Sequence, residues 1–137
     1  MNVLDCKNWS SGSGNSLNLT KVSEEVINHY NNNKRIFIGS DSFRSRKNIC
    51  FVTTVCLLTE RLGGRYFFYK EYVPPKKYST LATRITEEVR RSIELAEHFM
   101  ENHSVSPNMM ELHLDGFGCK LKPNAWASQS VADRHSK

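Results

Sequence analysis

The chain contains three long β-strand patterns that follow one another with only short polar connections. The patterns span residues 35–41, 48–59 and 64–73, and the connections read FRSRK and ERLGG. Connections this short join neighbouring antiparallel strands, so they predict a three-stranded antiparallel meander. The runs IFIG and CFVTTVCLL are almost continuously apolar, which is typical of strands covered on both faces. The sequence therefore predicts a sheet flanked by helices, an α/β fold.

Helical and strand periodicity extends this fold over the rest of the chain. Residues 20–31 and 79–102 carry apolar side chains at helical spacing, the first beginning at Thr20 and the second at Ser79 or Thr80. Residues 109–115 alternate between apolar and polar, which predicts a fourth strand. Residues 119–122 can form a fifth, short strand, and Asn124 can cap a final helix that reads AWASQSVADRH.

Length and composition indicate one globular domain. The 137 residues suffice for a single core, and residues 1–18 are expected to form a flexible lead-in to a domain at 19–137, because residues 8–18 are rich in Ser, Gly and Asn. The four cysteines have no zinc-finger spacing. The chain has neither a signal-peptide pattern nor an apolar run long enough for a membrane span, so we expect a cytoplasmic protein without a membrane partner.

The charge distribution is compatible with a nucleic-acid partner. The formal net charge is +5, which suits a polyanion but is equally common on an ordinary basic surface. The residues that we expect to contact phosphates lie close to the strand of Asp41 or follow the Pro74–Pro75 turn: Arg44, Arg46, Lys76 and Lys77.

Four acidic residues could supply a metal site. Asp41 follows a buried strand among small residues, and Glu88 lies on the rim of the apolar stripe of its helix. Asp115 ends the fourth strand, and Asp133 lies in the last turn of the final helix. Mg²⁺ and Mn²⁺ prefer oxygen ligands, and two such ions about 4 Å apart can activate water and stabilise the leaving oxygen in phosphodiester cleavage.

Each acid also has a purely structural interpretation. Asp41 can form a turn beside its serines, and the sequence D-G-F-G after LHL makes Asp115 a credible turn residue. The helix acids can be solvated and pair with neighbouring arginines, as Glu87 would with Arg90 or Arg91. Asp133 lies near a chain end, where helices fray.

Several strings together closely resemble the YkuK-like family, a group of bacterial and phage proteins classed as ribonuclease-H-like: IFIGSDS, GGRYFFYKE, EEVRRSIELAE, LHLD and KLKPNAWASQSVADR. The resemblance runs from about Leu17 onward, and KPNAWASQSVADR is its most specific part. It implies a ribonuclease-H-like mixed sheet of five strands flanked by helices. It also implies a metal-dependent nuclease site on Asp41, Glu88, Asp115 and Asp133.

One segment departs from the family pattern. In the family, LHLD is followed by a long connection that includes a helix, whereas only GFG separates Asp115 from Cys119 here. Adjacent parallel strands need a crossover of about a dozen residues. The segment therefore forms an antiparallel hairpin, loses or swaps its last strand, or omits residues that the natural protein has. Each option changes the position of Asp133.

The sequence is compatible with three functions. The leading hypothesis is a nuclease that cleaves RNA or an RNA–DNA hybrid with Mg²⁺ or Mn²⁺ held by the four acids. The alternative is a catalytically impaired module of the same fold that binds nucleic acid or another partner. A third is a protein-assembly unit, because one fold hosts many functions. The oligomeric state is not specified by the sequence.

Overall fold

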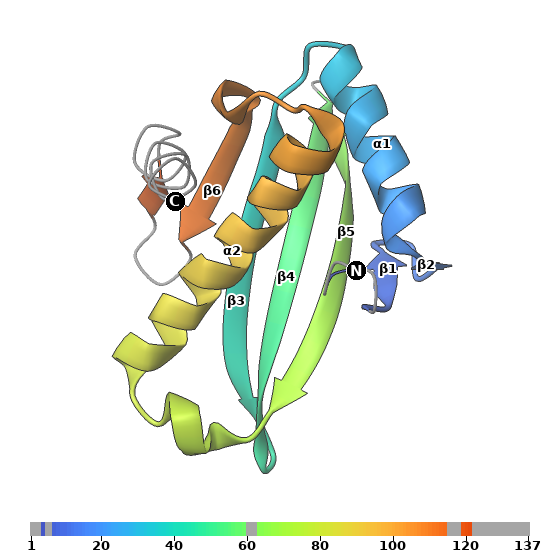
Figure 1. The fold of residues 1–137 in the computed structure, drawn as a ribbon. Helices are drawn as coiled ribbons and strands as arrows, with labels where there is room; N and C mark the ends of the chain where they lie inside the picture. The colour runs from blue at the N-terminus through green and yellow to red at the C-terminus, as the bar shows by residue number, and fades with distance from the viewer. Residues whose placement is uncertain (1–3, 5–6, 60–62, 115–118, 122–137) are drawn as a thin grey trace.

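The computed structural model describes Leu4 and residues 7–59, 63–114 and 119–121, which form a mixed sheet with two α-helices (Figure 1). The seven strands lie in the order β2-β1-β5-β4-β3-β6-β7. The three central strands of the meander are β3 (Ile36–Ser45), β4 (Asn48–Thr59) and β5 (Gly63–Val73). Both pairs are antiparallel, so the predicted meander is confirmed.

A two-residue turn, Arg46 and Lys47, joins β3 to β4. Ser45 pairs with Asn48, and Arg46 has a φ of 52°, in the left-handed region that tight hairpin turns require. This β3–β4 hairpin extends the sheet beyond the helices and presents its turn to solvent (Figure 1).

The two long helices begin at polar side chains that accept backbone hydrogen bonds. Helix α1 (Leu19–Asn31) is capped by Asn18, whose side chain accepts from the Lys21 N–H, and so begins before Thr20. Helix α2 (Leu81–His103) is capped by Thr80, one of the two residues that the sequence indicated. Two short 3₁₀ helices, η2 (Pro75–Tyr78) and η3 (Pro107–Met109), precede and follow α2.

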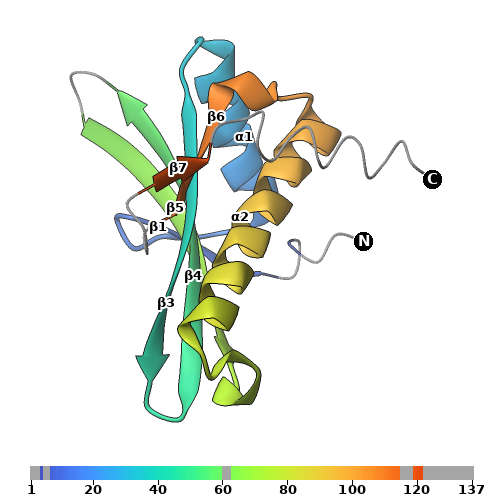
Figure 2. The same ribbon diagram turned by 90° about the vertical axis from the view of Figure 1, so that its left-hand side faces the viewer.

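Both helices cover the same face of the sheet (Figure 2). Alternate residues of β3 and β4, such as Ile36, Ile38, Val55 and Leu57, are buried against them together with Phe99 of α2. We call the opposite face of β3, β4 and β5 the open face, because no helix of the described chain lies on it. The apolar strand patterns predicted a sheet covered on both faces, but α1 and α2 cover only one of them.

Part of the N-terminal region belongs to the sheet instead of forming a loop. Strands β1 (Trp9–Ser11) and β2 (Ser16–Leu17) form a small hairpin that pairs with β5. Trp9 is fully buried, with its ring edge-on to Tyr69 at 4.8 Å. A single large aromatic residue thus anchors a segment whose composition otherwise predicts a loop.

Strand β6 (Met110–Leu114) completes a parallel pair with β3, and the long connection through α2 supplies the crossover that this requires. Strand β7 (Cys119–Leu121) then pairs antiparallel with β6. This antiparallel pairing is the one that the hairpin option requires, and residues 115–118, which connect the two strands, lie outside the described residues. The expected final helix from Asn124 lies outside the described residues.

Candidate functional site

Asp41 projects from the open face of the sheet. Its strand neighbours Ser40 and Ser42 are buried toward α2, whereas Asp41 itself is exposed. Its cross-strand partner is Val52, and its carboxylate accepts a hydrogen bond from the Ser42 backbone N–H at 2.9 Å. The carboxylate is thus available to solvent at the centre of β3.

A shallow cavity of about 760 Å³ lies on the open face around Asp41. Its other side-chain contributors come from three adjacent strands: Phe37, Phe43, Val52, Thr54, Cys56, Leu58 and His113. His113 on β6 is in register with Gly39, which brings its ring to the same face as Asp41. His113 is not among the site residues expected from the sequence, although the alternation of side chains along β6 places it on this face.

Glu88 lies on the other side of the sheet. It is buried, as the helical phase predicted for a residue facing the sheet, and it accepts a hydrogen bond from the Ser42 hydroxyl. Arg84 donates to the Ser42 hydroxyl at 3.1 Å and to the Ser42 carbonyl at 2.9 Å. Glu88 therefore belongs to a buried polar cluster between α2 and β3.

The structure does not bring Asp41 and Glu88 together. Ser42 points toward Glu88, and successive side chains of a strand point to opposite faces, so the two acids are separated by the sheet. Within the described residues, no three His, Cys, Asp or Glu side chains gather at one point as metal ligands. These residues do not fit a two-metal site that uses both Asp41 and Glu88. Asp115 and Asp133, the other predicted ligands, lie outside the described residues.

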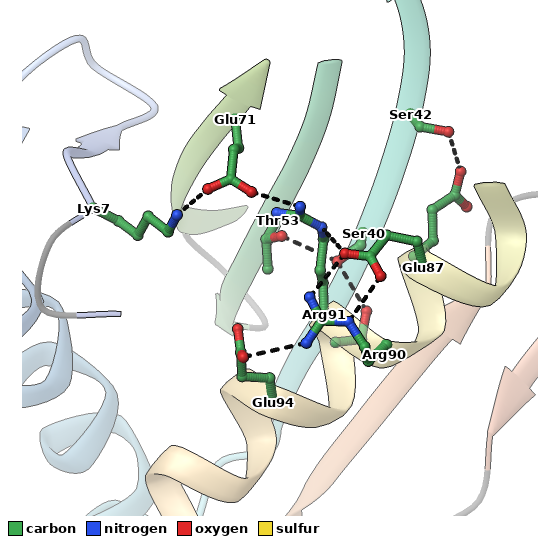
Figure 3. A network of polar contacts seen from close by, with 11 residues as sticks. Lys7, Ser40, Ser42, Thr53, Glu71, Glu87, Arg90, Arg91 and Glu94 are labelled. Atoms are coloured by element: carbon green, nitrogen blue, oxygen red, sulfur yellow. Dashed lines mark hydrogen bonds and ion pairs between the residues drawn. The ribbon is translucent and has the colours of Figure 1, made fainter. Parts of the chain in front are cut away.

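A buried chain of hydroxyl groups continues the polar layer beneath α2. Ser92 on α2 donates to Ser40 at 3.1 Å, and Ser40 donates to Thr53 on β4 at 3.2 Å (Figure 3). These bonds satisfy buried polar groups that would otherwise destabilise the interface between helix and sheet. The serines around Asp41 therefore act in packing.

Arg91 is the centre of an ion-pair network on the same face (Figure 3). Its side chain is only 6% exposed, and its guanidinium contacts Glu71 at 2.5 Å and Glu87 at 2.8 Å and lies 4.6 Å from the centre of the Phe51 ring. Burial alone would raise the pKa of Glu71, but hydrogen bonds from Lys7 and Arg91 outweigh it and lower that pKa. The pairing of Glu87 with Arg90 and Arg91, one of the structural interpretations considered for the helix acids, is present.

The predicted phosphate-contacting residues are exposed at one end of the sheet. Arg44 and Arg46 lie at the β3–β4 hairpin, and Lys76 and Lys77 lie in η2 at the same end (Figure 1). Lys47 lies with them in the hairpin turn, and Lys70 is exposed nearer the middle of β5, on the open face. None of these six cations forms an ion pair with a carboxylate in the part of the chain that the structure describes.

Comparison with known proteins agrees with this fold. A family model described as ribonuclease H-like matches residues 18–116, which is most of the chain. The chain belongs to the ribonuclease H-like family, and this membership points to a nuclease-like or nucleic-acid-related function. No curated protein and no solved structure matches it. None of the helices in the described ranges has the length and apolar character that a membrane crossing requires.

Proposed function

We propose that the protein binds nucleic acid through the end of the sheet formed by the β3–β4 hairpin and η2. The observation that carries this proposal is the group of exposed cations there, including Arg44, Arg46 and Lys47, that lack carboxylate partners within the described chain. Other arginines, such as Arg91, are neutralised by glutamates. Unpaired cations favour a polyanion because they release its condensed counterions.

Binding is better supported than two-metal cleavage. Cleavage of that kind needs several carboxylates around the ions, whereas Glu88 is held by Ser42 on the face opposite Asp41. This arrangement favours the alternative hypothesis of a catalytically impaired binding module, which keeps the fold but has an altered acidic site.

A metal-dependent nuclease acting on RNA or an RNA–DNA hybrid is the second candidate function. One observation favours it: Asp41 and His113 line the same cavity, and Leu114 is in register with Ser40, one residue before Asp115 in the chain. In this candidate, Asp41, Asp115 and Asp133 are the proposed ligands of Mg²⁺ or Mn²⁺. Glu88 contributes through packing.

A paired binding and cleavage assay distinguishes the two candidates. Single-stranded RNA, single-stranded DNA, duplex DNA and RNA–DNA hybrid are incubated with the full chain in EDTA, Mg²⁺ or Mn²⁺. We expect binding without cleavage, and we expect Asp41→Asn to bind at least as well as the parent, because it removes a negative charge from the open face.

Two other results of this assay would change the assignment. Cleavage in Mg²⁺ or Mn²⁺ that falls about a hundredfold in Asp41→Asn would establish the nuclease, since loss of a ligand removes several kcal/mol of metal-derived stabilisation. Glu24→Gln, on the exposed side of α1, is the matched control and should leave either activity unchanged. Failure to bind any of the four substrates at low salt would reject both candidates.

A further inference from the structure

The open face has a regular arrangement of large and small side chains. Residues directly opposite one another on β3, β4 and β5 point to the same face, and they form four rows across the sheet. The rows are Phe37–Cys56–Tyr66, Gly39–Thr54–Phe68, Asp41–Val52–Lys70 and Phe43–Cys50–Tyr72. The central strand β4 contributes only small or medium side chains, and every aromatic ring comes from β3 or β5.

We call the strip of smaller β4 side chains between these aromatic residues the trough; Phe37 and Phe43 on its β3 side line the cavity around Asp41. Several rings are well exposed despite their size: Phe43 is 43% exposed, Tyr66 46% and Tyr72 55%. The rings of Tyr66 and Phe68 are stacked, with their centroids 6.0 Å apart and their planes inclined by 27°. Exposed rings on a sheet surface offer flat apolar faces, which is the feature that unstacked nucleobases require.

Positive charge accompanies the rings. Lys70 lies in the middle of the face, 5.9 Å above the Phe68 ring, and Arg46 and Lys47 lie in the hairpin turn beyond the Phe43–Tyr72 row. Asp41 is the only described acid in the four rows. The trough thus combines apolar rings with a cationic end, and a polyanion with flat apolar groups complements both.

We infer that the open face binds single-stranded nucleic acid, with bases stacked on the rings of β3 and β5 and phosphates near Lys70 and the hairpin cations. This inference rests on the proposed function and specifies its ligand class and surface. A single strand fits better than a duplex because duplex bases are already stacked on one another and are not free to contact rings. A second copy of the chain fits less well, because it would bring like charges together at Lys70 and the hairpin.

Removal of two exposed rings tests this inference. Binding of a fluorescent oligothymidylate of about twelve nucleotides, a length within the usual range for such surfaces, is measured by anisotropy with the full chain. The double variant Phe43→Ala with Tyr72→Ala should bind about thirtyfold more weakly, which corresponds to the low end of stacking energies for two bases. Both side chains are exposed, so we expect the variant to stay folded, as circular dichroism would verify.

Two controls separate stacking from other effects. The swap Phe43→Tyr with Tyr72→Phe keeps both rings and should keep the affinity within about twofold, because stacking tolerates ring identity. Leu81→Ala removes a side chain that is 69% exposed on α2, away from the trough, and should leave the affinity unchanged.

The outcomes distinguish this inference from the broader proposal. If the parent protein binds no nucleic acid, the proposed function fails. If it binds the oligonucleotide but the ring-deletion variant binds equally well, or if a duplex of the same length binds more tightly, only the inference about the open face fails. If sedimentation shows a dimer that the ring-deletion variant disperses without any effect on oligonucleotide binding, the face is an interface between copies.

Discussion

Replacement of Trp9 with alanine is expected to lower the free energy of unfolding by about 3–5 kcal/mol, the usual cost of deleting a fully buried large aromatic side chain. Trp9 is 0% exposed and lies edge-on to Tyr69, so its removal leaves a cavity between β1 and β5. Urea denaturation followed by circular dichroism measures the change. The result would establish that the N-terminal hairpin is part of the core.

Two further variants identify the source of this effect. Trp9→Phe should cost much less, because the indole N–H has no hydrogen-bond partner within the described residues and the ring contact is largely kept. Leu58→Ala, at a position 52% exposed on the open face, should cost less than about 1 kcal/mol. A Trp9→Ala variant as stable as the parent would mean that the N-terminal segment does not pack as described.

Replacement of Arg91 with methionine is expected to cost about 3 kcal/mol of unfolding free energy, because removal of one member of a buried ion pair leaves its partners without full compensation. The change removes the contacts with Glu71 and Glu87 and the stacking on Phe51. Lys7 and Arg90 still neutralise the two glutamates in part, which keeps the expected loss at the lower end of the range for such pairs. Thermal and urea denaturation provide the measurement.

Arg90→Met is the matched control for this prediction. Arg90 contacts Glu87 and Glu94 on the same helix, but its side chain is 55% exposed. Exposed pairs contribute little, so the control should cost less than about 1 kcal/mol. Equal losses in the two variants would show that burial of Arg91 is not the source of its contribution.

Much of the fold could be predicted from local patterns. The short connections after β3 and β4 predicted the meander, and the apolar spacing with a threonine cap placed α2 within two residues of its start. Local composition did not predict the hairpin of β1 and β2, because this Ser- and Gly-rich segment contains only two large apolar residues, Trp9 and Leu17, that pack on the core. Its pairing with β5 is a long-range contact, and no periodicity within the segment predicts it.

The candidate site was harder to predict, because its geometry depends on strand parity. Ile36 and Ile38 face the core, so Ser40 and Ser42 share their face, and Asp41 must point away from it. Helical phase independently turned Glu88 toward the sheet. The sequence contains both patterns, the alternation along β3 and the helical phase of Glu88. The opposite orientation of the two acids follows only once it is known that α2 packs on the face of Ser40 and Ser42.

Side chains of β5 also alternate between the two faces of the sheet, and one of the two sets forms part of the open face. Tyr66, Phe68, Lys70 and Tyr72 alternate with Phe67 and Tyr69, which are buried. The sequence alone does not distinguish the covered set from the exposed one, because both contain aromatic residues. The position of the helices decides between them.

The salt dependence of single-strand binding tests the central claim, that the protein binds nucleic acid, most directly. If about five phosphates meet cations, the logarithm of the association constant should fall with the logarithm of salt concentration with a slope of about −3.5, roughly a hundredfold loss between about 50 and 200 mM. Replacing Arg44, Arg46 and Lys47 with alanine should reduce the slope to about −1.4, because three contacts are lost. Lys34→Ala, beyond the opposite end of the sheet, should leave it unchanged. Absence of binding at low salt, or an unaltered slope in the triple variant, would contradict the account.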